Sequence, residues 1–283
     1  MASFTNFATL SYNGGTTNSN IVTGEILEAL TAVKTAVSAN YSAGDRITYA
    51  LSLVNTGTAA VTDYTVTDNL GGYTVGANTV YPLAYNTGTV RYYINGVLQT
   101  APTVTAGPPL TVTGLTIPAG GSAVLIYETT ATPVAPLATG SSITNTATIT
   151  GGGLTNPITA QATVETATSA DLTISKALSP TTVTENDQIT YTFVISNTGN
   201  TEATATGNVV VTDTFAPILR NIAVTYNGTA WTEGTNYTYN AATGVFTTLA
   251  GQITVPAATF TQNTDGTFTV TPGTATLVIT GTV

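Results

Sequence analysis

Lys34, Asp68 and Asn145 form a set of side chains that can join two strands of one chain through an amide bond. The chain has two lysines, Lys34 and Lys176. In both cases the residues two positions before and two positions after the lysine are apolar. A neutral lysine amine is a nucleophile that can attack the carbon of a neighbouring carboxamide. A protonated aspartic acid can polarise that carboxamide and pass a proton to the departing ammonia. The three residue types therefore predict an intramolecular isopeptide bond, with Asp68 as its acid.

A second set repeats two of the three residue types. Lys176 and Asp213 occupy the positions of the lysine and the aspartate of the first set in a second copy of a repeat. This copy has no closing asparagine of its own, but Asn6 lies in a segment that resembles the strand around Asn145. We expect Asn6 of one subunit to join Lys176 of another, with Asp213 as the acid.

Strand alternation places these polar residues on apolar faces. The inward face of the closing segment of the first copy consists of Ile143, Asn145, Ala147 and Ile149. Burial disfavours charge, so the pKa of a lysine on such a face is expected to fall and that of an aspartic acid to rise. The same residues also fit a simpler alternative, a buried polar cluster whose members satisfy one another's hydrogen bonds without reacting.

The elements that carry these residues belong to an internal repeat. AGDRITYALSLVNTG at 43–57 matches ENDQITYTFVISNTG at 185–199, and Asn-Gly dipeptides at 95–96 and 227–228 predict hairpin turns. Residues 26–37 have a helix-like composition, but their repeat partner does not, so both are expected to be strands. Short alternating strands predict an all-β chain of two tandem immunoglobulin-like β-sandwich domains with an N-terminal donor strand. The expected boundaries are 1–24 for the donor strand and linker, 25–165 for a complete first sandwich, and 166–283 for a second sandwich without its last strand.

The donor strand is predicted from a match between the two ends of the chain. The second copy ends with TATLVITGTV at 274–283, which matches SAVLIYETTA, the segment before the closing strand of the first copy. The closing strand itself, SITNTATI at 142–149, is matched by SFTNFATL at 3–10. The segment at 12–20 is expected to be a linker. The donor face consists of Phe4, Asn6, Ala8 and Leu10. Inserting this strand into the second domain of the next subunit would assemble copies head to tail.

Composition excludes several classes of function. Charged residues make up 7% of the chain and the net charge is −9, which argues against binding to nucleic acid or an anionic membrane. The chain has no His and no Cys, so the usual metal sites and catalytic bases and nucleophiles are missing, and we expect no metal, no cofactor and no conventional enzyme activity. Self-catalysed isopeptide formation, once per site, is the exception. We find neither a signal peptide nor a sortase signal in this chain.

The motifs resemble a known bacterial family. A lysine followed by G-D-x-I-T-Y, N-T-G, V-T-D and I-T-N-T-A is similar to the bacterial conserved-repeat domain of unknown function numbered eleven. That domain occurs in surface adhesins and in subunits of clostridial spore appendages. The chain also resembles Cna-type adhesin modules, whose isopeptide bonds use Lys, Asp and Asn on strands in this order. The resemblance implies these roles for Lys34, Asp68 and Asn145, and for Lys176 with Asp213.

These observations predict a structural subunit of an extracellular fibre, pilus-like filament or spore appendage, at the surface of a cell or spore. Its partners are expected to be copies of itself, with other fibre or spore-coat proteins as further candidates. The alternative is a tandem sandwich adhesin or carbohydrate-binding surface module. Such a module would use the tyrosine-rich segments 81–93 and 226–239 for binding.

Overall fold

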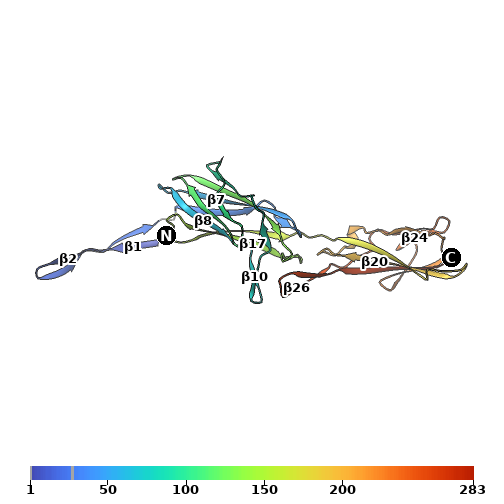
Figure 1. Cartoon of the computed structure of the whole chain (residues 1–283). Helices are drawn as coiled ribbons and strands as arrows, with labels where there is room; N and C mark the ends of the chain where they lie inside the picture. Colours follow the sequence, from blue (N-terminus) through green and yellow to red (C-terminus); the bar gives the residue numbers. More distant parts are fainter. Residues whose placement is uncertain (1, 27–28) are drawn as a thin grey trace. The chain divides into compact units, whose positions relative to one another are not determined.

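The computed structural model describes residues 2–26 and 29–283, and Figure 1 shows that strands dominate the fold. The chain divides into two compact units. The first comprises Met1–Thr74, Thr79–Thr132 and Ile143–Val164, and the second comprises Val75–Asn78, Pro133–Ser142 and Glu165–Val283. Each unit contains a β-sandwich, so the prediction of an all-β chain with two tandem sandwiches is confirmed. In the described part of the chain, no helix is long and apolar enough to cross a membrane.

Two six-stranded sheets form the first sandwich. One sheet has the order β13 (Val97–Leu98), β12 (Arg91–Ile94), β16 (Ser122–Ala131), β7 (Arg46–Asn55) and β5 (Leu30–Ala36), with β11 (Leu83–Tyr85) also paired to β16. The other has the order β14 (Thr103–Thr105), β15 (Leu110–Ile117), β8 (Val61–Asp68), β17 (Ser142–Gly151), β18 (Ile158–Thr166) and β6 (Asn40–Tyr41). A separate hairpin consists of β9 (Tyr73–Val75) and β10 (Asn78–Val80).

Alternating burial along the long strands of the first unit builds its core. In β16 every second side chain is buried, and the same holds for most of β17. The segment that composition alone would allow as a helix is the strand β5, as its repeat partner indicated, while residues 27 and 28 lie outside the described residues. Valine, isoleucine, threonine and tyrosine favour this pleated, half-buried setting.

The second sandwich has fewer strands in its second sheet. Its larger sheet has the order β19 (Leu172–Ser179), β20 (Gln188–Asn197), β28 (Gly273–Thr282), β22 (Arg220–Tyr226) and β23 (Thr229–Trp231). The smaller sheet has the order β21 (Thr212–Thr214), β25 (Val245–Thr248) and β24 (Tyr237–Asn240). The hairpin of β26 (Thr259–Gln262) and β27 (Phe268–Thr271) and the short 3-10 helix η1 (Ala205–Gly207) complete the described elements of this unit.

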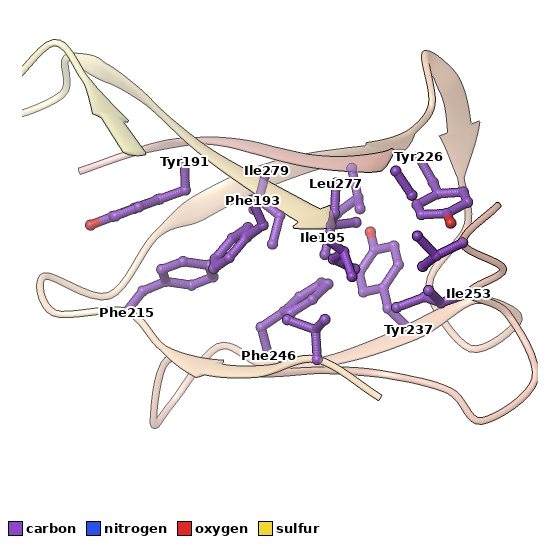
Figure 2. Close-up of a cluster of buried hydrophobic side chains, with 14 of the residues drawn as sticks. Tyr191, Phe193, Ile195, Phe215, Tyr226, Tyr237, Phe246, Ile253, Leu277 and Ile279 are labelled. Carbon is purple, nitrogen blue, oxygen red and sulfur yellow. The ribbon is translucent and has the colours of Figure 1, made fainter. Parts of the chain in front are cut away.

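Aromatic side chains fill the core of the second unit. Figure 2 shows Phe193 and Ile195 of β20 in the core with Phe246 of the opposing sheet, whereas Tyr191 of the same strand points away from Phe246, on the side of Phe215. Phe215 packs against Tyr191 with ring centres 4.8 Å apart, and Phe246 itself is fully buried. This core forms although the smaller sheet has only three strands.

The segment predicted to be a donor strand and linker is a hairpin. β1 (Ala2–Asn6) pairs with β4 (Val22–Ile26), and β2 (Thr9–Tyr12) pairs with β3 (Gly15–Asn18). The prediction of a linker at 12–20 is therefore wrong for residues 15–18, because Asn13 and Gly14 form a two-residue turn that folds the chain back on itself. We call the described residues 2–26 the arm; it is drawn in blue in Figure 1.

Truncating Phe246 should destabilise the second unit alone. Phe246→Ala removes a fully buried ring that packs 5.2 Å from the ring of Tyr237, and we expect a loss of about 3–5 kcal/mol in the free energy of unfolding of this unit. Thermal unfolding followed by calorimetry measures the change. Val245→Ala on the same strand is the matched control, since Val245 is 37% exposed, and it should cost far less. Equal losses in both variants would contradict this description of the core.

Candidate functional site

Lys34 and Asp68 form a buried ion pair between the two sheets of the first unit. Lys34 lies on β5 and Asp68 at the end of β8, so the pair joins one sheet to the other. The distance from Lys34 Nζ to Asp68 Oδ2 is 2.5 Å, and the two side chains are 0% and 1% exposed. The backbone N–H of Leu70 donates to Asp68 Oδ1 at 3.0 Å. Both carboxylate oxygens therefore accept hydrogen bonds although water is excluded.

Asn145 lies next to this pair on β17. β17 pairs directly with β8, with Ala147 opposite Asp68, so Asn145 is two residues further along the neighbouring strand. Its side chain is fully buried, and its Oδ1 has no hydrogen-bond partner among the described residues. An unpartnered buried acceptor is costly. The structure thus brings the three predicted residues of the first set together and leaves the carboxamide oxygen open to a donor.

Two tyrosines that sequence reasoning missed complete the cluster. The Tyr127 hydroxyl donates to Asp68 Oδ2, and Asn145 Nδ2 donates to the same hydroxyl at 3.5 Å. Tyr49 stacks on Tyr127 with ring centres 5.8 Å apart, and Lys34 Nζ lies 4.9 Å from the centre of the Tyr49 ring. Alternation along β16 places Tyr127 on the inward face, which was the available signal for its role.

Burial controls the protonation of this cluster. Desolvation lowers the pKa of Lys34 to about 8, against the opposing effect of the Asp68 charge and hydrogen bond. Desolvation also raises the pKa of Tyr49 and of Tyr127, and the charge of Asp68 raises both further. The tyrosines therefore stay protonated and can donate hydrogen bonds, while the lysine amine loses its proton far more easily than in water.

The second set is only partly enclosed. Lys176 on β19 forms an ion pair with Asp213 on β21, but the two side chains are 40% and 18% exposed. The backbone N–H of Thr214 donates to Asp213 Oδ1 at 2.9 Å. Ile279 lies opposite Tyr191 on the neighbouring strand, where the first unit has Tyr127 opposite Tyr49, so this pair has no equivalent of the Tyr127 hydroxyl.

The exposure of the second pair follows from the order of strands around Asp213. Asp68 has Leu110 of β15 on one side and Ala147 of β17 on the other. Asp213 has Phe246 of β25 on one side, and β21 pairs with no other strand in the described ranges. β25 therefore occupies the place of β15, and the place of β17 is open. The predicted inward face of β19 is covered only in part, since Leu172 and Leu178 are half-buried against the core whereas Ile174 is 54% exposed.

The predicted donor residues lie in the arm. Phe4 and Leu10 are 54% and 63% exposed, and Asn6 lies opposite Val22 in the hairpin. Ala8, between β1 and β2, accepts a hydrogen bond from the backbone N–H of Ser19. Because a single chain cannot bring together the donor and acceptor of two subunits, the joining of Asn6 to Lys176 stays a prediction. In the described residues, no group of three or more His, Cys, Asp and Glu side chains is placed to hold a metal ion.

Comparisons with known proteins find similarity in structure only. No family model and no curated protein matches the chain, so the resemblance to the conserved-repeat domain stays a prediction. BcpA, the major pilin subunit of Bacillus cereus, is similar at 15% identity over 96% of this chain and 73% of that chain, with a TM-score of 0.36. The pilus backbone RrgB from Streptococcus pneumoniae is 12% identical over 86% of this chain and 55% of that one, with a TM-score of 0.34.

An adhesin is similar over a smaller part. The N-terminal domain of the Streptococcus gordonii adhesin Sgo0707 is 15% identical over 48% of this chain, with a TM-score of 0.36, and the matched part spans 32% of that chain. At these scores and identities, the likeness does not say what this chain binds or assembles with.

The free Lys34 amine should make stability depend on pH. In Asn145→Ala the amine cannot react, and its pKa is about 8 in the folded state against an ordinary value of 10.5. Between these values the unfolded chain binds more protons than the folded chain, so the free energy of unfolding of the first unit should rise with pH, by at most about 1.4 kcal/mol per pH unit. Denaturant unfolding between about pH 8 and 9.5 measures the change in the free energy of unfolding. The upper limit stays below the ordinary pKa of tyrosine, so that tyrosine ionisation does not contribute.

A second substitution provides the control for this dependence. Lys34→Met added to Asn145→Ala removes the titrating amine and should abolish the rise. A free energy of unfolding that stays flat or falls with pH in Asn145→Ala itself would show that burial does not lower the pKa of Lys34.

Proposed function

We propose that the chain is a structural subunit of an extracellular fibre, pilus-like filament or spore appendage, in which copies join head to tail. The observation that carries this proposal is the open edge of β21 beside the ion pair of Lys176 and Asp213. The first unit fills the same place with β17 and its buried Asn145. The arm carries a segment with the sequence pattern of β17, including Asn6 at the position of Asn145.

An isopeptide bond between Lys34 and Asn145 would strengthen the first unit. The lone pair of neutral Lys34 Nζ forms a bond to Asn145 Cγ, and the bond from Cγ to Nδ2 breaks. One proton of the amine passes by way of Asp68 to Nδ2, which leaves as ammonia, so that no other reactant is needed. The buried pair, the lowered pKa of Lys34 and the open Asn145 Oδ1 support this reaction.

The placement of this bond suits a fibre under tension. β5 lies at the start of the first sandwich and β17 near its end, and the two strands belong to different sheets. A covalent bond between them would carry force applied to the two ends of the domain without loading the hydrogen bonds of the strands between. In a chain without cysteine, it would serve as the crosslink that disulfides provide in other surface proteins.

The second crosslink would join two subunits. Insertion of the arm at the β21 edge would extend the sheet by β-augmentation and cover the exposed pair of Lys176 and Asp213. The enclosed amine of Lys176 would then be the nucleophile, and the carboxamide of Asn6 would be the electrophile. A contact between two different surfaces of one chain propagates as a filament unless it closes into a ring.

The alternative of a carbohydrate-binding module finds less support. Tyr92, Tyr226 and Tyr237, from the two tyrosine-rich segments, are 5%, 9% and 4% exposed. The Tyr92 hydroxyl donates to the backbone carbonyl of Thr116, and that of Tyr226 donates to the carbonyl of Thr254. These three side chains pack in the two sandwiches and offer no platform on which a sugar ring could stack, while Tyr81, Tyr85, Tyr93 and Tyr239 of the same segments are half-buried.

Denaturing gels with intact mass measurement test the proposal. After boiling in SDS, the assembled protein should give a ladder of multimers, and each crosslink should lower the mass by one ammonia. Asn6→Ala should collapse the ladder to monomers that still lack one ammonia from the first unit. Asn145→Ala is the matched control, and it should keep the ladder while each of its subunits loses one ammonia fewer. A ladder that survives Asn6→Ala would refute crosslinking through the arm.

Tyr127 should accelerate the reaction in the first unit. Its hydroxyl lies between Asp68 Oδ2 and Asn145 Nδ2, where it can hold the carboxyl in place and hand a proton to the leaving nitrogen. Since general acid catalysis contributes roughly 10²–10⁴-fold, Tyr127→Phe should slow crosslinking at least about tenfold. The mass of the chain, followed over time after refolding, gives this rate.

Tyr64→Phe is the control for the loss of a buried hydroxyl. Tyr64 is also fully buried in the first unit, but its hydroxyl is hydrogen-bonded to Tyr92, away from the reacting groups. It should crosslink at the rate of the unchanged chain. If the Tyr127 and Tyr64 variants react equally fast, Tyr127 has only a structural role.

A further inference from the structure

The arm leaves unusually many apolar side chains exposed for a two-stranded element. Phe4, Phe7, Leu10, Tyr12 and Val22 are each more than half exposed. A hairpin of two strands is at best marginally stable in water, so its apolar side chains need a surface that covers them. Donation of a single strand would cover the apolar side chains of β1 and β2. It gives no reason for the exposed apolar side chain of Val22 on β4.

In the sequence, the arm comes directly before the first strand of the first sandwich, as the hairpin of β17 and β18 comes directly before the first strand of the second. β17 is followed by a turn at 152–157, by β18, and after five residues by β19, the first strand of its sheet. β1 and β2 are followed by the turn at Asn13 and Gly14, by β3 and β4, and after three residues by β5. Both hairpins thus lead directly into the edge strand that carries the reactive lysine.

The strand registers of the two hairpins agree at the position of the reactive asparagine. Thr144 and Thr163 are hydrogen-bonded through their hydroxyls at 2.9 Å, and the backbone N–H of Thr166 donates to the carbonyl of Ser141, a register that places Ile143 opposite Val164 and Asn145 opposite Ala162. In the arm, Thr5 lies opposite Thr23, with Phe4 opposite Gly24 and Asn6 opposite Val22. The same threonine pair therefore occurs beside both asparagines.

The neighbouring apolar pair shows a compensating change in size. Ile143 and Val164 are 2% and 0% exposed in the first unit. Their counterparts are Phe4 and Gly24, and a Cβ atom on Gly24 would lie only 2.4 Å from the Phe4 ring. A larger residue on one strand is thus matched by the smallest residue on the other, which keeps the volume of the pair suited to a buried position.

We infer that the donated element is the whole hairpin of residues 2–26 of a second copy of this chain, with β1 and β2 in the place of β17 and with β3 and β4 in the place of β18. This inference rests on the proposed function and identifies the surface that one copy offers to the next. In the first unit β18 pairs with the outer edge of β17 and leads on to β6. A donated hairpin closes that edge in the second unit, whereas a single donated strand leaves it open.

A disulfide across the hairpin tests whether both strands insert together. Thr5 and Thr23 are directly opposite and both exposed, and the chain has no native cysteine, so Thr5→Cys with Thr23→Cys gives one defined crosslink. We expect the oxidised full-length variant to form as much sedimentable fibre as the unchanged chain. Fibre formation by the reduced form but not by the oxidised form would show that β1 and β2 leave the hairpin to insert alone, which overturns the inference.

A substitution on β4 gives a second, independent measurement. Val22→Asp should lower the fraction of assembled chain at least about tenfold, because the counterpart of Val22 in the first unit, Ala162, is 8% exposed. Val97→Asp is the matched control, since Val97 is 64% exposed on β13 and lies outside the hairpin. Assembly of Val22→Asp at the level of Val97→Asp would overturn the inference even if the disulfide variant assembled in neither redox state.

Failure of the proposed function gives a different result. Deletion of residues 2–12 removes β1 and β2, and a chain that still assembles after this deletion does not polymerise by donation of these strands. If the deletion abolishes assembly but Val22→Asp has no effect, strand donation holds and only the inference of a donated hairpin is wrong.

Discussion

The ion pair between a lysine on the edge strand of one sheet and an aspartate on the facing sheet is the interaction on which the rest of this structure depends. In the first unit the pair is enclosed on all sides, with side chains 0% and 1% exposed. Enclosing two charges is unfavourable unless hydrogen bonds surround them. Tyr127 and the backbone of Leu70 provide those bonds, and the asparagine beside them completes the buried cluster.

The corresponding pair in the second unit shows which strands enclose the pair in the first unit. Lys176 and Asp213 meet as closely as their counterparts do, yet they stay partly exposed. The difference lies in the neighbouring strands, because β8 is flanked by β15 and β17, whereas β21 is paired with β25 alone among the described strands. Enclosure of the pair in this fold is therefore a property of the completed sheet. A subunit whose second pair becomes buried only on assembly would react only after the correct partner has bound.

In the proposed function, the arm connects this chemistry to assembly. Its strands form a hairpin because an Asn-Gly turn folds residues 15–26 back onto residues 2–12. It also repeats the asparagine, the threonine pair and the position before a lysine-bearing strand that characterise the hairpin of β17 and β18. One sequence pattern thus occurs both inside the first domain and at the start of the chain, where we propose that it forms the joint between subunits.

The sequence by itself determined the all-β fold, the repeat and the three residues of the first set, because alternation with period two assigns each residue of a strand to a face. It missed Tyr49 and Tyr127, since alternation shows that they point inward but not that they lie against Asp68. It also read residues 15–18 as a linker, although Asn13 and Gly14 carry a turn signal. Only the tertiary structure decided which strands flank each aspartate, and hence the burial that lowers the pKa of Lys34, because strand order arises from long-range pairing.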